Sequence, residues 1–177
     1  HVLVEAGVGI GKSFAYIVPI LYYSKIYHRP VVIATSTIAL QEQLTHDIEK
    51  IMDMLNYEVE VLIAKGQNHF LCKKRFDDCF TKEFITESEE HQIIYDAICK
   101  FGYEKADWNV AIPDEIWNRI NVKEYKSQFC KDKCSYCGSC HYHNLRQKMM
   151  STHGIIVCNQ DLLAVNMHKK ANCRRQL

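Results

Sequence analysis

The sequence lacks long apolar runs, an excess of charge of one sign and low-complexity tracts. Apolar stretches such as Ile17–Leu21, which contains Pro19, are far shorter than the ~20 residues that a membrane-spanning helix needs. The formal net charge of the 177 residues is only +1, so nucleic-acid binding would have to come from local patches of Lys and Arg. With 47% hydrophobic and 24% charged residues, wholesale disorder is excluded. We expect a folded protein with no membrane partner.

An initial Met and a signal peptide are also missing. The chain starts at His1 and runs directly into the apolar residues Val2–Val4, without a basic start or a small-residue cleavage site. We therefore expect a trimmed start, an end at Leu177 that is not a natural boundary, and a cytoplasmic location. In a reducing compartment, clustered cysteines favour a metal site over disulfides.

Short apolar strands alternate with amphipathic helices early in the chain and again near its end. Strands are predicted at residues 2–5, 31–35, 59–64 and 154–159, and helices at residues 13–26, 40–55 and 160–169. This order predicts the α/β class, with parallel strands joined by right-handed crossovers. Residues 65–150 interrupt the pattern and hold most of the cysteines. We expect one α/β domain, residues 1–64 and 151–177, with an inserted, largely helical Cys-rich subdomain at 65–150.

The turn after the first predicted strand fits a phosphate-binding loop. Residues 6–13 read Ala-Gly-Val-Gly-Ile-Gly-Lys-Ser, with Ala6 at the position of the first glycine of the strict pattern. The backbone can wrap closely around phosphates at Gly7, Gly9 and Gly11. Lys12 is then placed to reach the β and γ phosphates, and the Ser13 hydroxyl to bind Mg²⁺. The helix that follows adds its N-terminal dipole, so we predict binding of ATP with Mg²⁺.

Nine cysteines are the unusual part of the composition. Four of them, Cys130, Cys134, Cys137 and Cys140, fall within eleven residues. A structural zinc ion would be satisfied by this local group, whereas an iron–sulfur cluster needs four thiolates and could take one from the distant Cys72. Local spacing does not decide between the two metals. Small buried apolar positions suit the remaining cysteines, Cys79, Cys99, Cys158 and Cys173.

Four segments, in this order, carry a resemblance to a known family. They are Glu5–Ser13, Ile33–Leu44, Lys65–Cys72 and Ile155–Leu163. Together they resemble the DinG branch of the XPD/DinG-like superfamily 2 DNA helicases. The resemblance implies a RecA-like P-loop domain whose insertion holds a [4Fe-4S] cluster. It implies cluster ligands at Cys72, Cys130, Cys134 and Cys140, with Cys137 as the alternate to Cys140.

The same resemblance implies contacts with DNA. Thr35, Thr37 and Gln41 match a family segment that lies along single-stranded DNA, and Lys65 opens the segment that leads into the cluster domain. Helix capping and ordinary surface polarity are the alternative explanation for these four residues.

Two parts of the family's machinery have no counterpart among these residues. Neither an Asp-Glu-Ala-His box nor a second RecA-like domain is present in the 177 residues. Asp114-Glu115 follows Pro113 without an apolar strand leading in, so we reject it as the catalytic acid pair. We expect the N-terminal portion of an ATP-dependent DNA helicase that moves 5′ to 3′ on single-stranded or forked DNA. Alone it is expected to be inactive, because hydrolysis would need the missing C-terminal half of the same protein.

Two other hypotheses fit the residues. One is a zinc-stabilised nucleotide-binding interaction module without motor activity, which metal analysis would distinguish. The other is a nuclease-associated ATPase on a DinG-like scaffold, which residues upstream of His1 would decide.

Overall fold

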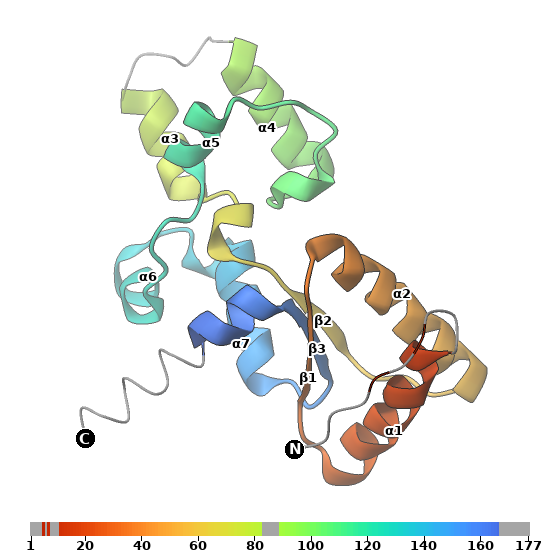
Figure 1. The fold of residues 1–177 in the computed structure, drawn as a ribbon. Coiled ribbons are helices and arrows are strands. Elements are labelled where there is room, and N and C mark those ends of the chain that lie inside the picture. Colours follow the sequence, from red (N-terminus) through yellow and green to blue (C-terminus); the bar gives the residue numbers. More distant parts are fainter. Residues whose placement is uncertain (1–4, 6, 8–10, 83–88, 167–177) are drawn as a thin grey trace. The chain divides into compact units, whose positions relative to one another are not determined.

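The computed structural model describes residues 5, 7, 11–82 and 89–166 of the chain. The chain divides into two compact units: unit 1 combines residues 1–65 and 149–177, and unit 2 is residues 66–148. Figure 1 labels the elements. Unit 1 holds α1 (Lys12–Tyr27), β1 (Val31–Thr35), α2 (Ile38–Leu55), β2 (Val61–Ala64) and β3 (Ile155–Asn159). Unit 2 holds α3 (Lys73–Lys82), α4 (Glu89–Phe101), α5 (Asp114–Ile120) and α6 (Ser127–Lys133), and α7 (His141–Ser151) continues from it into unit 1. Short 3₁₀ turns occupy Gln67–His69, Lys105–Asp107 and Cys137–Ser139.

The three described strands form a parallel sheet in the order β1-β3-β2. Side chains alternate between the two faces of a strand, so Ile155 and Val157 pack against α1 and α2, while Ile156 and Cys158 pack on the other face. That second face also contacts residues 162 and 163, which belong to the helical stretch 160–166. The predicted α/β class with parallel strands is confirmed.

Local sequence signals account for α2. The Thr37 Oγ1 accepts a hydrogen bond from the Leu40 backbone N at 3.2 Å, which caps the first turn. A stripe of side chains recurs at helical spacing and is buried against the sheet: Gln41, Leu44, Ile48 and Ile51. Asn56 ends the helix in the left-handed conformation at φ 47°. The predicted helices at residues 40–55 and 13–26 correspond to α2 and α1, whereas the strand predicted at residues 2–5 lies almost wholly outside the described residues.

A glycine allows β3 to enter between its neighbours. A Cβ atom at Gly154 would lie 2.0 Å from the carbonyl oxygen of Glu60, far inside van der Waals contact. The Gly154 carbonyl accepts from the Val31 backbone N at 3.0 Å, and the Ile155 N donates to the Glu60 carbonyl at 2.8 Å. This position therefore ties the start of β3 to both flanking segments, and only glycine fits there.

Unit 2 is largely helical and has two separate cores. In the larger core, Trp108 and Trp117 meet edge to face with ring centroids 5.5 Å apart. Each indole N–H donates to a backbone carbonyl, from Trp108 to Gly102 at 2.8 Å and from Trp117 to Asn68 at 2.9 Å. The smaller core contains Phe70, Val122 and Tyr142, with Cys72 and Cys140 packed against it. Among the described residues, no helix combines the length and apolar character that a membrane crossing would require.

Candidate functional site

The predicted phosphate-binding loop leads into α1. Gly11 precedes α1 at φ 79° and ψ 29°, a left-handed conformation that favours glycine. Having no side chain, Gly11 does not cap the first N–H groups of α1, and the first turn carries no acidic residue. The Lys12 ammonium donates to the Gly7 carbonyl at 2.8 Å, and both residues are exposed. A helix start of this kind attracts anions. Ser13 is half-buried, and Ala6 and Gly9 lie outside the described residues.

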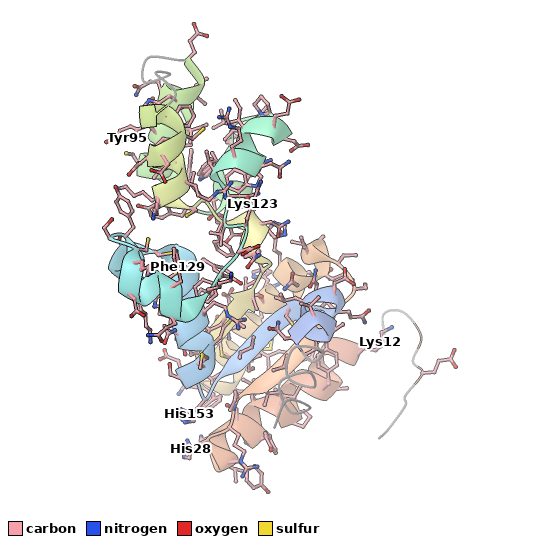
Figure 2. The ribbon with its side chains drawn as sticks, turned by 90° about the vertical axis from the view of Figure 1, so that its left-hand side faces the viewer. Lys12, His28, Tyr95, Lys123, Phe129 and His153 are labelled. Carbon is pink, nitrogen blue, oxygen red and sulfur yellow. The ribbon has the colours of Figure 1, made fainter. Side chains whose placement is uncertain are left out.

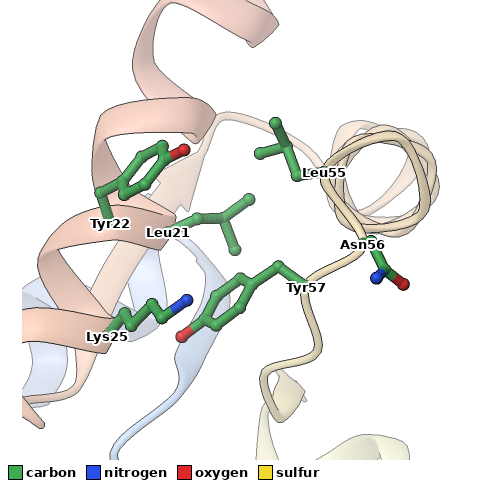
Figure 3. A pocket seen from close by; sticks show the side chains of 6 residues that line it. All are labelled: Leu21, Tyr22, Lys25, Leu55, Asn56 and Tyr57. Atoms are coloured by element: carbon green, nitrogen blue, oxygen red, sulfur yellow. The ribbon is translucent and has the colours of Figure 1, made fainter.

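A small cavity near the other end of α1 is distinct from this loop. It encloses about 60 Å³ and is lined by Leu21, Tyr22, Lys25, Leu55, Asn56 and Tyr57 (Figure 3). The Lys25 Nζ lies 4.8 Å from the centre of the Tyr57 ring. Lys25 is thirteen positions along the helix from Lys12, or about 20 Å at 1.5 Å per residue. The cavity is well below the ~300 Å³ of an ordinary ligand pocket.

The carboxyl ends of the parallel strands gather polar residues at one edge of the sheet. Thr35, the last residue of β1, pairs with Asn159, the last residue of β3. The Thr35 hydroxyl donates to the Thr37 carbonyl at 2.9 Å, and the Asn159 Oδ1 accepts from the Leu162 backbone N at 2.8 Å. Lys65 follows β2, and its Nζ lies 3.8 Å from a Glu42 carboxylate oxygen. Of the predicted DNA residues, Thr35 ends β1, Thr37 follows β1 and Lys65 follows β2, so all three belong to this edge.

Gln41 does not lie on that surface. Its side chain is 1% exposed, and its Nε2 donates to the carbonyl of Ala64 at 3.2 Å and to that of Val157 at 3.3 Å. The amide therefore joins α2 to β2 and β3. Burial and these two hydrogen bonds are at odds with the predicted DNA contact, because in this structure the side chain is closed off from the surface.

Unit 2 brings the predicted cysteine ligands together although they are far apart in the sequence. Cys72, Cys134 and Cys140 line one cavity, and the described cysteines are all free thiols. Burial raises the pKa of the Cys130 thiol, and the nearby Cys134, Cys137 and Cys72 raise it further. Burial also raises the pKa of Cys140, with added contributions from Cys72 and Cys130.

Cys140, rather than Cys137, shares its surroundings with Cys72. Cys72 and Cys140 line the same cavity, and Cys137 is not among the residues that line it. Among the described residues, no three His, Cys, Asp or Glu side chains already surround a single point as they would a bound ion. Thiolates select zinc or iron–sulfur clusters, so the donor chemistry suits either metal.

Two further residues around this cavity are not among the predicted metal ligands. Tyr136 and His141 line it, and the Tyr136 hydroxyl donates to the Asp77 carboxylate. This hydrogen bond and the charge of Asp77 raise the pKa of Tyr136. His141 stacks on Phe70 with ring centroids 5.8 Å apart. Both residues are close in sequence to cysteines, which is the one signal that marks them.

The rejected pair Asp114-Glu115 opens α5 in unit 2, where Asp114 pairs with Lys105.

A parallel sheet packed with helices, with a lysine-bearing helix starting directly after a glycine-rich loop, defines a RecA-like domain of the P-loop class. The family model for the DEAD/DEAH box helicases matches residues 1–106, more than half of the chain. The chain belongs to the DEAD/DEAH box helicase family. Membership of this family implies ATP and Mg²⁺ as ligands.

Similar proteins confirm the resemblance to DinG-type helicases. The chain is 24% identical over 188 residues to the ATP-dependent helicase DinG of Mycobacterium tuberculosis, covering 94% of this chain and 28% of that protein. It is 25% identical over 178 residues to the ATP-dependent DNA helicase DinG of Photobacterium profundum, covering 92% of this chain and 25% of that protein. It is 38% identical over 84 residues to the 3′-5′ exonuclease DinG of Bacillus subtilis, covering 47% and 9%. The chain thus spans only a minor part of these relatives.

Proposed function

We propose that this chain is the nucleotide-binding front part of an ATP-dependent DNA helicase that moves 5′ to 3′ along single-stranded DNA. The observation that carries the proposal is Lys12 at the open start of α1, after Gly11 in its left-handed conformation, on the sheet of a DEAD/DEAH chain. In the whole protein, ATP binds between this domain and a second RecA-like domain, and its hydrolysis drives movement along DNA.

The nucleotide site consists of the loop backbone and two side chains. Residues Ala6, Gly7, Gly9 and Gly11 supply backbone around the phosphates. The Lys12 ammonium, which now donates to the Gly7 carbonyl, exchanges this acceptor for β and γ phosphate oxygens. Ser13 holds Mg²⁺ through its hydroxyl. These residues bind and orient the nucleotide, while the acidic box that activates water in the family is absent from the 177 residues.

The DNA strand runs along the carboxyl edge of the sheet. Thr35, Thr37 and Lys65 belong to this edge in unit 1. Thr37 also caps α2, and capping and DNA contact are compatible there, because the residue stays exposed while its hydroxyl accepts from Leu40. Gln41 contributes indirectly: its buried amide fixes α2 to β2 and β3, the strands whose carboxyl ends form part of this edge.

Cys72, Cys130, Cys134 and Cys140 hold a [4Fe-4S] cluster, with Cys137 as the alternate to Cys140. Cys72, Cys134 and Cys140 line one cavity, and the charges of Cys134 and Cys72 raise the pKa of Cys130, which supports this set. When bound, the cluster supplies a covalent-strength crosslink between segments that are distant along the chain. The protein positions the first of these cysteines before the cluster binds, because the Cys72 backbone N donates to the Ile120 carbonyl at 2.8 Å. Closing so long a loop restricts unit 2 to a rigid shape.

A nucleotide-binding experiment tests the phosphate site. Equilibrium binding of a fluorescent ATP analogue with Mg²⁺ is compared between the wild type and Lys12→Ala. Loss of a charge-assisted contact is expected to weaken binding by roughly 10- to 100-fold. Circular dichroism should stay unchanged, because Lys12 is exposed. Lys25→Ala, on the same helix but away from the loop, is the matched control. Unchanged affinity in Lys12→Ala contradicts the assignment of the loop.

Metal analysis tests the cluster. Protein purified without oxygen is expected to contain stoichiometric iron and sulfide and to absorb broadly in the visible range. Zinc at one ion per chain would instead support the nucleotide-binding module without motor activity. Neither result changes the expected binding of ATP, so the two sites are tested independently.

A further inference from the structure

One aromatic ring in unit 2 is exposed between two lysines. Phe129 on α6 is 49% exposed (Figure 2). The Nζ of Lys74, from the start of α3, lies 6.0 Å from the centre of its ring, and the Nζ of Lys133, one turn further along α6, lies 5.9 Å from it. We call Phe129, Lys74 and Lys133 the Phe129 platform.

Packing does not explain this ring. Phe129 belongs to neither of the two cores of unit 2. The neighbouring Cys130 is half-buried, whereas the phenyl ring of Phe129 is left largely in water at a cost in hydration free energy.

The two lysines beside the ring carry positive charge that no ion pair in the described part of the chain neutralises. Among the described residues, neither Lys74 nor Lys133 forms an ion pair. Two nearby carboxylates already have partners: Asp132 accepts from Gln128 at 2.9 Å, and Asp77 accepts from the Tyr136 hydroxyl. Lys73 adds a further ammonium 5.3 Å from the centre of the Tyr136 ring. An exposed ring flanked by uncompensated ammonium groups matches an unpaired base with its phosphates.

We propose that the Phe129 platform binds single-stranded DNA, with one base stacked on Phe129 and adjoining phosphates held by Lys74 and Lys133. This inference rests on the proposed function, from which it takes the DNA. A cation about 6 Å from an exposed ring is a weak contact at the limit of its range. Base stacking on an aromatic ring is the stronger interaction, so the base displaces the ammonium groups. The lysines then move to the phosphates and release bound counterions.

The stacking contact selects unpaired DNA. A base inside a duplex has both faces covered by its neighbours and cannot stack on Phe129 without leaving the helix. The two lysines, in contrast, attract the phosphates of either form. Phe129 therefore provides the preference for single strands, and Lys74 and Lys133 provide affinity that does not depend on strandedness.

Binding of a fluorescein-labelled oligothymidylate, followed by anisotropy, tests the platform. Phe129→Leu keeps an apolar side chain but removes the aromatic face, and it is expected to weaken binding by roughly 5- to 100-fold. Phe129→Trp is expected to bind at least as tightly as the wild type. The matched control is Phe101→Leu, because Phe101 is also an exposed phenylalanine of unit 2 (36%) with a lysine, Lys100, 5.2 Å from its ring centre. This control should bind like the wild type.

Salt and duplex measurements separate the roles of the three side chains. Lys74→Gln should lower the slope of log affinity against log salt by about one, while Phe129→Leu should leave that slope unchanged. Binding of a blunt duplex should respond to Lys74→Gln and not to Phe129→Leu. Because Phe129 precedes Cys130, the metal content of each variant is measured, and variants are compared at equal metal content.

Each outcome has a definite meaning. Selective loss of single-strand binding in Phe129→Leu, with Phe129→Trp intact, supports the platform. Equal binding by the wild type and Phe129→Leu overturns it but leaves DNA binding by the edge of the sheet. Equal losses in Phe129→Leu and Phe129→Trp also overturn it, because they indicate altered packing. If the wild type binds ATP but no single-stranded DNA, both the platform and the proposed helicase function fail.

Discussion

Replacing Gln41 with alanine is expected to destabilise unit 1 by about 2–4 kcal/mol. The side chain is 1% exposed, so truncation leaves a cavity between α2 and the sheet, and the lost methylene group costs about 1 kcal/mol. The two long hydrogen bonds to Ala64 and Val157 contribute roughly 0.5–1.5 kcal/mol each. Gln41→Leu keeps most of the volume and loses only these hydrogen bonds, so it should cost about 1–3 kcal/mol.

Hydrogen exchange of the β3 amides measures this change where it occurs. Exchange in Gln41→Ala should accelerate by roughly 30- to 1,000-fold, with Gln41→Leu intermediate. Both tryptophans, Trp108 and Trp117, lie in unit 2, so urea unfolding followed by their fluorescence should not shift and serves as the internal control. Unchanged exchange together with weakened DNA binding would refute the reasoning, and would return Gln41 to the DNA contact that the sequence predicts.

Three further predictions concern single residues. Gly154→Ala should destabilise the protein by about 3 kcal/mol or more, because its Cβ would meet the Glu60 carbonyl, whereas Gly138→Ala, with open space around it, should change little; equal urea midpoints in circular dichroism would contradict this. Burial raises the pKa of the Cys158 thiol above its ordinary 9.0, so the folded state holds that proton more tightly than the unfolded state. This contribution to stability is complete below about pH 9, the pKa of the unfolded state, and is lost as the pH rises through the higher folded pKa. Cys158→Ala should therefore remove part of the loss of stability above about pH 9, and an equal loss in the wild type and the variant would contradict this. Cys72→Ser should abolish stoichiometric metal binding while ATP binding persists, and full metal content in this variant excludes Cys72 as a ligand.

Elements specified by short-range signals could be predicted from the sequence. β1 is a run of Val, Val, Ile, Ala and Thr with a cap residue two positions later, and its bounds agree with the prediction. The order β1-β3-β2 could not be predicted in this way, because it depends on pairing between Val31 and Ile155 across an intervening unit. Strand pairing at such separation leaves no local mark in either strand.

The residues of the candidate site also fall into two groups: some are marked by a local motif, and others depend on segments that are distant in the sequence. Lys12 and Ser13 are identified by a contiguous motif, and the structure puts them at the start of α1. The resemblance places Gln41 at the DNA with the rest of its segment, although it stands in register with Leu44, Ile48 and Ile51 on the buried stripe of α2. Its position on that stripe is the sequence signal that indicates burial. The partners of that amide, two strand carbonyls, come from distant segments that no local pattern reveals.

The central place of β3 bears on how the protein is made. In the described sheet, β1 and β2 each pair with β3, which the ribosome delivers only after all of unit 2 has been synthesised. Until then, the lysine-bearing helix and its two strands have no completed sheet to pack on. Unit 2 can mature first, since its own cores lie within one continuous segment. Completion of the nucleotide-binding domain during translation therefore waits for a strand that lies, in the sequence, beyond the whole cysteine-bearing unit.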